Sequence, residues 1–347
     1  MTTGMKKFTK GCLYTALVIF IIGAVLCSVG GLLGGFRQLD NMDIGKITGI
    51  PLIYRIGPNG HFEYGFRFWD SNDIDWGKYE SWQRVNDNEG TRALNLTADT
   101  LRNLYIEAGA CELHIEESED EYVWLAVGDD ANTLRYHIED GDLRIVRKSN
   151  WTMHWVGINI IDTTDEVYLY LPKGTSLDYM DIEFGAGKMD SIELTAHDAN
   201  IEVGAGELDI DGLTVDNEAV LTVGAGKIRI KNLVCDVVDM DIGAGELDVN
   251  DAAVAKEANI DLGMGSANIG GIITGDLNVD CSMGEVTLDM DDAEQNHNYE
   301  IDCSMGTVKV GRNSYSGMGS ERTVNNGSNS DFVIDCSMGT VTVKFAD

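Results

Sequence analysis

Apolar and polar residues alternate through the C-terminal two thirds of the chain, and a glycine hinge interrupts the alternation at regular intervals. Examples are "IEVGAGELDI" at 201–210 and "LTVGAGKIRI" at 221–230. Successive hinges lie 19, 20, 19, 20, 19, 22 and 33 residues apart, counted at the second glycine of each: Gly187, Gly206, Gly226, Gly245, Gly265, Gly284, Gly306 and Gly339. A period of two is typical of strands, and a fixed repeat indicates a stack of similar units.

Three columns of apolar residues appear when the repeats are aligned. Two residues before the hinge stand Ile182, Ile201, Leu221, Met240, Ile260, Val279, Ile301 and Ile334, and another apolar residue directly precedes it. A third column follows the hinge, from Met189 and Leu208 onward. Alternate residues of a strand share a face, so these columns point inward together. The pattern predicts an all-β, parallel β-solenoid-like stack over 95–347, with weaker repeats at 106–115 and 136–145.

The N-terminal segment has a different pattern. Residues 11–36 carry no charge and are long enough for one transmembrane helix. Residues 1–10 contain Lys6, Lys7 and Lys10 and no acid, which predicts a cytoplasmic N-terminus and an extracytoplasmic body in a single-pass cell-membrane protein. A cleaved signal peptide and a lipoprotein signal are the alternatives.

Residues 37–94 form a juxtamembrane segment that is rich in aromatic side chains. Phe66, Phe68, Trp69, Trp76, Tyr79 and Trp82 all lie within 51–84. Such side chains favour lipid headgroups. They could equally cap the open end of the stack, or contact a membrane partner.

The charge balance narrows the range of partners. Acidic residues number 58 against 25 basic ones, for a net charge of −33. Nucleic acid is excluded as a partner, because its phosphates require Lys and Arg. A protein or a cell-wall glycan fits better, and the surface attracts cations.

One outward column is almost wholly acidic. It contains Thr222 and seven carboxylates, which are Glu183, Glu202, Asp241, Asp261, Asp280, Asp302 and Asp335. Stacked like charges repel each other, and Ca²⁺ could relieve the repulsion, so these residues are calcium candidates. The alternative is a solvated acidic face that prevents edge pairing. Directly after the hinge, Lys188, Glu207, Lys227 and Glu246 alternate in sign and predict a ladder of ion pairs.

No catalytic or cofactor motif is recognisable, and the chain is predicted to be non-enzymatic. Cys281, Cys303 and Cys336 occupy an inward column and are interpreted as small apolar core residues rather than a redox or metal column. Met264, Met283, Met305 and Met338, at the hinge centres, are interpreted as core filler. Residues 311–331, rich in Gly, Ser and Asn, predict a mobile loop that leaves the stack.

Three stretches resemble a known family: "VYLYLPKGTSLDYMDIEFGAGKMD" at 167–190, the "GAG" repeats, and "IDCSMGTVTVKF" at 334–345. They are similar to a proposed bacterial adhesin domain of unknown function, which is related to the toast-rack domains of envelope-stress membrane proteins. The resemblance covers roughly residues 95–347. It implies a repetitive all-β domain, often behind a membrane helix, in a Gram-positive-type bacterium, and it carries no catalytic residues.

These observations favour a membrane-anchored extracytoplasmic binding or scaffold protein of the cell envelope. It would be adhesin-like or part of envelope-stress sensing. Two alternatives stay open: a glycan-active solenoid enzyme, and a calcium-dependent adhesion module.

Overall fold

The structure is a computed structural model that describes residues 54–56, 62–64, 82–84, 91–128, 134–147, 166–316 and 319–346. The chain divides into two units, 1–66 and 67–347. In the first unit, β1 (Tyr54–Ile56) pairs antiparallel with β2 (Phe62–Tyr64). The expected transmembrane helix at 11–36 lies outside the described residues. Within the described part of the chain, no helix has the length and apolar character needed to cross a membrane.

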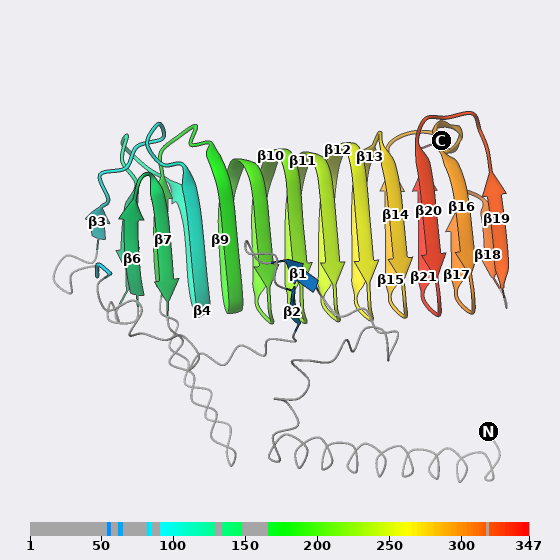
Figure 1. Cartoon of the computed structure of the whole chain (residues 1–347), viewed down its shortest axis with the longest axis horizontal. Helices are drawn as coiled ribbons and strands as arrows, with labels where there is room; N and C mark the ends of the chain where they lie inside the picture. Colours follow the sequence, from blue (N-terminus) through cyan, green and yellow to red (C-terminus); the bar gives the residue numbers. More distant parts are fainter. Residues whose placement is uncertain are drawn as a thin grey trace, which may run out of the picture. The chain divides into compact units, whose positions relative to one another are not determined.

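The second unit contains a stack of parallel coils, seen as a row of strands in Figure 1. Four long bent strands form its centre: β9 (Leu177–Val203), β10 (Glu207–Val223), β11 (Lys227–Ile242) and β12 (Glu246–Leu262). Each pairs in parallel with the next, with register shifts at a bend such as Val215 to Glu218. Each coil therefore has three arms, which in β10 are a post-hinge arm at 207–210, a middle arm at 213–215 and a pre-hinge arm at 218–223.

The register confirms the inward columns. Leu221 pairs with Ile201 on one side and with Met240 on the other. These three side chains are at most 2% exposed and belong to one continuous buried cluster. Burying a side chain of this size stabilises the fold by about 1.5–3 kcal/mol. The alternating apolar pattern thus builds a single core along the stack.

The hinge glycines are required by close packing between neighbouring coils. A Cβ atom at Gly226 would collide with the carbonyl oxygen of Gly206 and would lie 2.9 Å from the Val203 side chain. Of the predicted hinge glycines, Gly187 has a positive φ, +99°. Close approach of the backbones, more than left-handed backbone geometry, therefore explains the recurring glycine.

The C-terminal coils do not stack in sequence order. Beyond β12, the post-hinge arms continue with β13 (Ser266–Ile273) and β15 (Glu285–Met290), and the pre-hinge arms with β14 (Asp276–Cys281). The next coil is the last in the sequence, β20 (Asp331–Cys336) with β21 (Thr340–Phe345). The coil of β16 (Asn298–Cys303) and β17 (Thr307–Val310) lies outside it. The chain thus forms the outer coil of β16 and β17 first. It then returns and inserts β20 and β21 between that coil and the coil of β14 and β15.

Residues 311–331 differ from the expected mobile loop. They contain β18 (Asn313–Ser316) and β19 (Ser320–Val324), which pair antiparallel with β17 and β16. Both lie at the end of the row in Figure 1. Antiparallel pairing covers the exposed edge of the last parallel coil, and an uncovered edge would invite association with another chain.

The other end of the stack is also closed by antiparallel strands. The repeat at 106–115 lies in β4 (Asn103–Glu117), which pairs in parallel with β9. The repeat at 136–145 forms a hairpin instead, β6 (Leu134–Glu139) with β7 (Asp142–Arg147). Also at this end are β3 (Thr91–Ala93), β5 (Trp124–Val127) and β8 (Glu166–Leu171). The sheet thus begins slightly before residue 95.

One residue of the aromatic segment contributes to this closure. The indole of Trp82 stacks on His137, with ring centroids 5.3 Å apart. The next residue, Gln83, exchanges backbone hydrogen bonds of 2.9 and 3.0 Å with Tyr136 of β6. Capping is therefore the role of Trp82, while the other five aromatic residues lie outside the described part of the chain.

Candidate functional site

The acidic column forms a continuous row on the pre-hinge arms. Its C-terminal part, here called the aspartate ladder, has the spatial order Asp241, Asp261, Asp280, Asp335 and Asp302. Asp335 thus lies between Asp280 and Asp302 because β20 is inserted there. Neighbouring strands are about 4.8 Å apart, so each carboxylate has another beside it.

The remaining acidic candidates lie toward the N-terminal end. Thr222 separates Glu202 from Asp241, pairing with both, and Glu183 pairs with Glu107 of β4. The ladder is half-buried at Asp241 and Asp261 and exposed from Asp280 onward.

Desolvation, followed by the charges of neighbouring acids, raises the pKa of three carboxyl groups in the ladder. Partial burial, and then the charges of Asp241 and Asp280, raise the pKa of Asp261 to about 6. Burial also raises the pKa of Asp241, with a further contribution from Asp239. The pKa of Asp335, which is more exposed, is raised by partial desolvation and then by Asp280 and its other acidic neighbours. Both causes disfavour the charged form of a carboxyl group.

An amide-rich column runs beside the ladder and is internally paired. Asn259 Nδ2 donates to Asp239 Oδ1 at 2.7 Å, and Asn278 Nδ2 donates to Asn259 Oδ1 at 2.8 Å. Together the two columns line a shallow hollow of about 440 Å³. The hollow offers the ladder carboxylates on one side and Asp239, Asn259 and Asn278 on the other, and these polar groups suit cationic or hydroxyl-bearing groups.

Calcium binding stays a prediction. Across the described ranges, no three His, Cys, Asp or Glu side chains are grouped so that they could hold a metal ion. Each coil supplies one carboxylate of the ladder, whereas Ca²⁺ takes six to eight oxygen ligands.

The post-hinge arms carry the predicted ion pairs. Lys227 Nζ lies 2.6 Å from Glu246 Oε1 and 2.5 Å from Asp248 Oδ2. Arg229 Nη1 lies 2.7 Å from Asp209 Oδ1 and also contacts Glu207. Lys188 pairs in register with Glu207. Charges of opposite sign therefore meet across neighbouring coils on this face.

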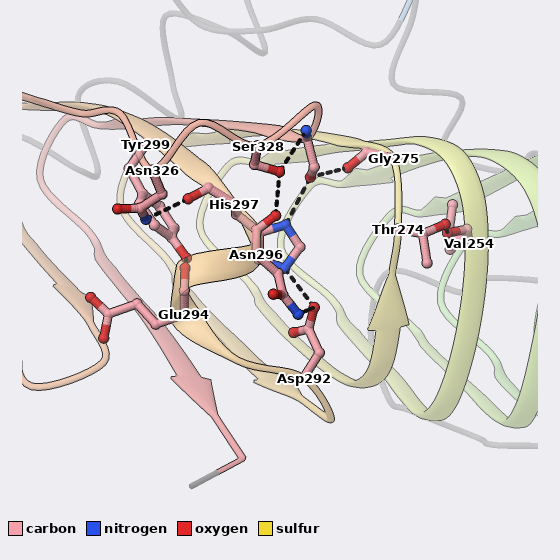
Figure 2. A network of polar contacts seen from close by, with 11 residues as sticks. Val254, Thr274, Gly275, Asp292, Glu294, Asn296, His297, Tyr299, Asn326 and Ser328 are labelled. Carbon is pink, nitrogen blue, oxygen red and sulfur yellow. Dashed lines mark hydrogen bonds and ion pairs between the residues drawn. The ribbon is translucent and has the colours of Figure 1, made fainter.

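A buried polar network lies where the chain returns to insert its last coil (Figure 2). His297 is 1% exposed, and its Nδ1 lies 2.7 Å from Ser330 Oγ. Its Nε2 lies 2.8 Å from Asp292 Oδ2. Ser330 Oγ donates to the carbonyl oxygen of Gly275 at 2.5 Å. The imidazole thus joins the segments that precede β14, β16 and β20.

Further contacts strengthen this junction. Asn326 Nδ2 donates to the carbonyl of His297 at 2.7 Å, and Ser328 Oγ donates to the carbonyl of Asn296. The His297 ring stacks on Phe332 with centroids 4.0 Å apart. The network satisfies the backbone groups of the crossing segments, which would be costly to bury unpaired.

The Ser330, His297 and Asp292 set resembles a hydrolase triad in composition but not in arrangement. Ser330 is 4% exposed, so a substrate could not reach its hydroxyl. Its hydroxyl hydrogen is directed at Gly275 O, whereas an activated serine directs it at the base. The set is therefore a structural junction.

The structure corrects the interpretation of the hinge methionines. Met264, Met283, Met305 and Met338 are 52–65% exposed, so they are not core filler. The hinge residues 263–265, 282–284, 304–306 and 337–339 are bends rather than strand, so the alternation of faces is interrupted there and the middle residue can point outward.

Cys281, Cys303 and Cys336 are buried free thiols, as expected for small core residues. Cys336 pairs in register with Cys281 on one side and with Cys303 on the other. Burial raises the pKa of Cys281 to about 12, which keeps that thiol protonated and unreactive.

A known family model covers most of the chain. The toastrack family model DUF4097 matches residues 101–344. The chain belongs to this family. Among curated proteins, none matches.

Several solved structures are similar. A proposed lipid-binding protein from Parabacteroides distasonis is 14% identical, with a TM-score of 0.40, over 76% of this chain and all of that chain. A proposed adhesin from Parabacteroides merdae is 17% identical, with a TM-score of 0.34, over 76% of this chain and 99% of that chain. A proposed adhesin from Bacteroides fragilis is 10% identical, with a TM-score of 0.34, over 73% and 95%.

Sequence reasoning did not find the His297 junction. Its members are far apart in sequence, and isolated Ser, His and Asp residues show no spacing that indicates contact. The one available signal was the lengthening of the last two repeat intervals, which marks where the chain departs from simple stacking.

Proposed function

We propose that this toastrack protein is a non-enzymatic, membrane-anchored binding or scaffold protein of the bacterial envelope. Its stack would lie outside the cytoplasm and present the aspartate ladder to a cationic or hydroxyl-rich partner, a protein or a cell-wall glycan. The anchor is the uncharged segment 11–36 with its basic flank.

The observation that carries the proposal is the unbroken run of carboxylates from Asp241 to Asp302. Five consecutive coils place an aspartate at the same position, although like charges side by side destabilise a sheet. Amide side chains in the adjacent column show that a neutral polar residue is compatible with the same arm. A partner that brings positive charge or hydroxyl donors would relieve the repulsion on binding.

Binding by the full chain tests this proposal. The variant Asp241→Asn, Asp261→Asn, Asp280→Asn and Asp335→Asn removes four ladder charges and keeps each side chain's size. Living cells that express it are treated with a carboxylate-to-amine crosslinker, and binding to isolated cell-wall sacculi is measured separately. We expect both the crosslinked products and sacculus retention to fall at least fivefold if the ladder is the contact surface for both, and only one of them to fall if it contacts one partner class.

A charge-matched control separates the ladder from net charge. Glu193→Gln, Asp216→Asn, Asp251→Asn and Asp291→Asn neutralise four exposed acids outside the ladder. Equal losses in both fourfold variants, or no loss in either, would reject a role for the ladder. Protease added to intact cells tests the topology: if residues 95–347 resist digestion until the cells are lysed, the extracytoplasmic placement is wrong.

A further inference from the structure

A ridge of four methionines runs along the hinge edge of the C-terminal coils. In spatial order the methionine ridge consists of Met264, Met283, Met338 and Met305. The backbone N–H of Met283 donates to Gly263 O, that of Met338 to Ser282 O, and that of Met305 to Ser337 O, at 2.7–2.8 Å. The four side chains therefore leave from successive coils, about 4.8 Å apart.

The fold does not require methionine at this position. Ala225 and Ala244 occupy it in earlier coils with the same hinge hydrogen bonds. Methionine is usually among the more buried residue types, yet these four are 52–65% exposed. The hinge therefore does not explain why four neighbouring, exposed and flexible thioether side chains occur here.

We propose that the methionine ridge is a binding site for a soft monovalent cation of the Cu(I) class. Thioether sulfur is a soft, uncharged ligand that selects Cu(I) over hard ions such as Mg²⁺ and Ca²⁺. The ligands are the Sδ atoms of neighbouring methionines, and no electron transfer is involved.

The coil spacing suits this coordination. A metal–sulfur bond is roughly 2.3 Å long, as in zinc–thiolate sites. Two sulfurs on either side of one ion are then separated by about 4.6 Å, close to the ~4.8 Å between coils. Three rotatable bonds in each methionine allow small adjustments, so adjacent pairs can clamp an ion without movement of the backbone.

The surroundings favour a cation. Met264, Met283 and Met338 line an open hollow of about 680 Å³ that also includes Glu246 and Glu285. These carboxylates and the net charge of −33 raise the local concentration of positive ions. The ridge is open to solvent, so an ion has a direct entry path.

An apolar docking surface is the competing explanation, and substitution by leucine separates the two. Leucine has nearly the same volume and hydrophobicity as methionine but no sulfur. The test variant is Met264→Leu, Met283→Leu, Met305→Leu and Met338→Leu in the full chain, purified in detergent. Ag(I), supplied as silver nitrate in chloride-free buffer, is the redox-inert probe.

Two measurements are made on the same samples. Equilibrium dialysis gives the number of Ag(I) ions bound per chain, and carbon-13 methyl NMR follows the methionine side chains. We expect wild type to bind at least one more ion than the four-leucine variant, and the ridge methyl resonances to shift. The seven cysteines are present in both chains, so their contribution cancels in the difference.

A matched control substitutes a buried methionine. Met240 lies in the core and is 2% exposed, so Met240→Leu should leave the number of Ag(I) ions bound per chain unchanged. Circular dichroism melting verifies that each variant is folded. Equal Ag(I) binding by wild type and the four-leucine variant, or unshifted ridge methyl resonances, would overturn the proposal and favour apolar docking.

Discussion

The pre-hinge and post-hinge arms of the stack are built alike, yet they handle charge in opposite ways. Both consist of short parallel strands in register over one apolar core. On the post-hinge arms, Lys227 and Arg229 each contact two carboxylates of neighbouring coils. On the pre-hinge arms, Asp241, Asp261 and Asp280 lie side by side on neighbouring coils, without a basic residue between them.

The difference shows that the repeat determines where each side chain lies on the stack. The type of side chain at each outward position determines whether its charge stabilises or destabilises the fold. Exposed ion pairs contribute about 0–1 kcal/mol each, so the post-hinge face gains modestly. The aspartate ladder lowers stability instead, because the raised pKa of Asp261 means that folding disfavours the charged form of its carboxyl group. A face that is retained at a cost in stability is the better candidate for binding.

The largest expected effect comes from substituting a hinge glycine, because the hinge connects the pre-hinge and post-hinge arms. Gly226→Ala places a Cβ against the Gly206 carbonyl and the Val203 side chain, at the junction of both arms. We expect a loss of about 2–3 kcal/mol in the free energy of unfolding, typical of overpacking. Denaturant unfolding of the full chain measures it.

The control for this prediction is Gly174→Ala. Gly174 has φ +74°, and a Cβ there meets no atom within 4 Å. Its cost should be about 1 kcal/mol, from backbone geometry alone. If both substitutions cost the same, close approach between coils is not what the hinge glycine provides.

Asn278→Asp would extend the carboxylate character of the pre-hinge face. It removes the 2.8 Å hydrogen bond to Asn259 Oδ1 and adds a charge beside the ladder. We expect a destabilisation of about 1 kcal/mol at pH 7, the net value of a lost hydrogen bond. The loss should diminish at acidic pH as the new carboxyl becomes protonated. Asn232→Asp, which loses an exposed 3.1 Å hydrogen bond to the carbonyl oxygen of Asp211 outside the ladder, is the comparison, and an equal loss there would show that the ladder is not special.

Asp261→Asn should have the opposite sign. The folded-state pKa of about 6 exceeds the usual value of about 3.9. The folded form then binds more protons between these values, so stability falls as pH rises from about 4 to about 6 and stays lower above it. Allowing for solvent screening of a half-exposed group, we expect Asn to stabilise the chain by about 1 kcal/mol at pH 7.

Thermal melting between pH 4 and pH 8 measures this effect. The advantage of Asp261→Asn should vanish near pH 4, where the wild-type carboxyl is already protonated. Asp216→Asn, an exposed acid outside the ladder, should change stability by less than about 0.5 kcal/mol. A pH-independent advantage at position 261 would contradict a charge-based explanation.

The smallest effect on stability is expected on the post-hinge face, where the charges are paired. Lys227→Gln leaves Glu246 and Asp248 without their shared cation. The loss should be about 0.5–1 kcal/mol at low salt and should shrink in 0.5 M sodium chloride, because exposed pairs are screened. Lys309→Gln, an exposed lysine of β17, is the control. Equal small losses in the two variants would mean that the ion-pair ladder adds no stability.

Much of the fold was predictable from local pattern. Because side chains of a strand alternate between two faces, the residues flanking each hinge, such as Leu221 and Val223, had to be buried. The alternating charges at Lys227 and Glu246 were predictable for the same reason. The acidic column was also visible, since seven of its eight members are carboxylates.

The order of the coils and the contacts that secure it were not predictable. Every coil presents the same backbone hydrogen-bonding edge, so β14 could accept β16 or β20 equally well by pattern alone. The insertion of β20 is stabilised by His297, Ser330 and Asp292, whose approach depends on three segments meeting in space.

By itself, the sequence determined which residues face inward, where each coil turns, and that one outward column is acidic. Alternation and hinge spacing are local properties, and they hold whichever coil is the neighbour. Only the tertiary structure decided that Asp335 stands between Asp280 and Asp302, that β18 and β19 close the stack, and that the hinge methionines form one exposed ridge. The physical reason is that these facts depend on which equivalent edge each strand finally pairs with, a choice made by long-range packing.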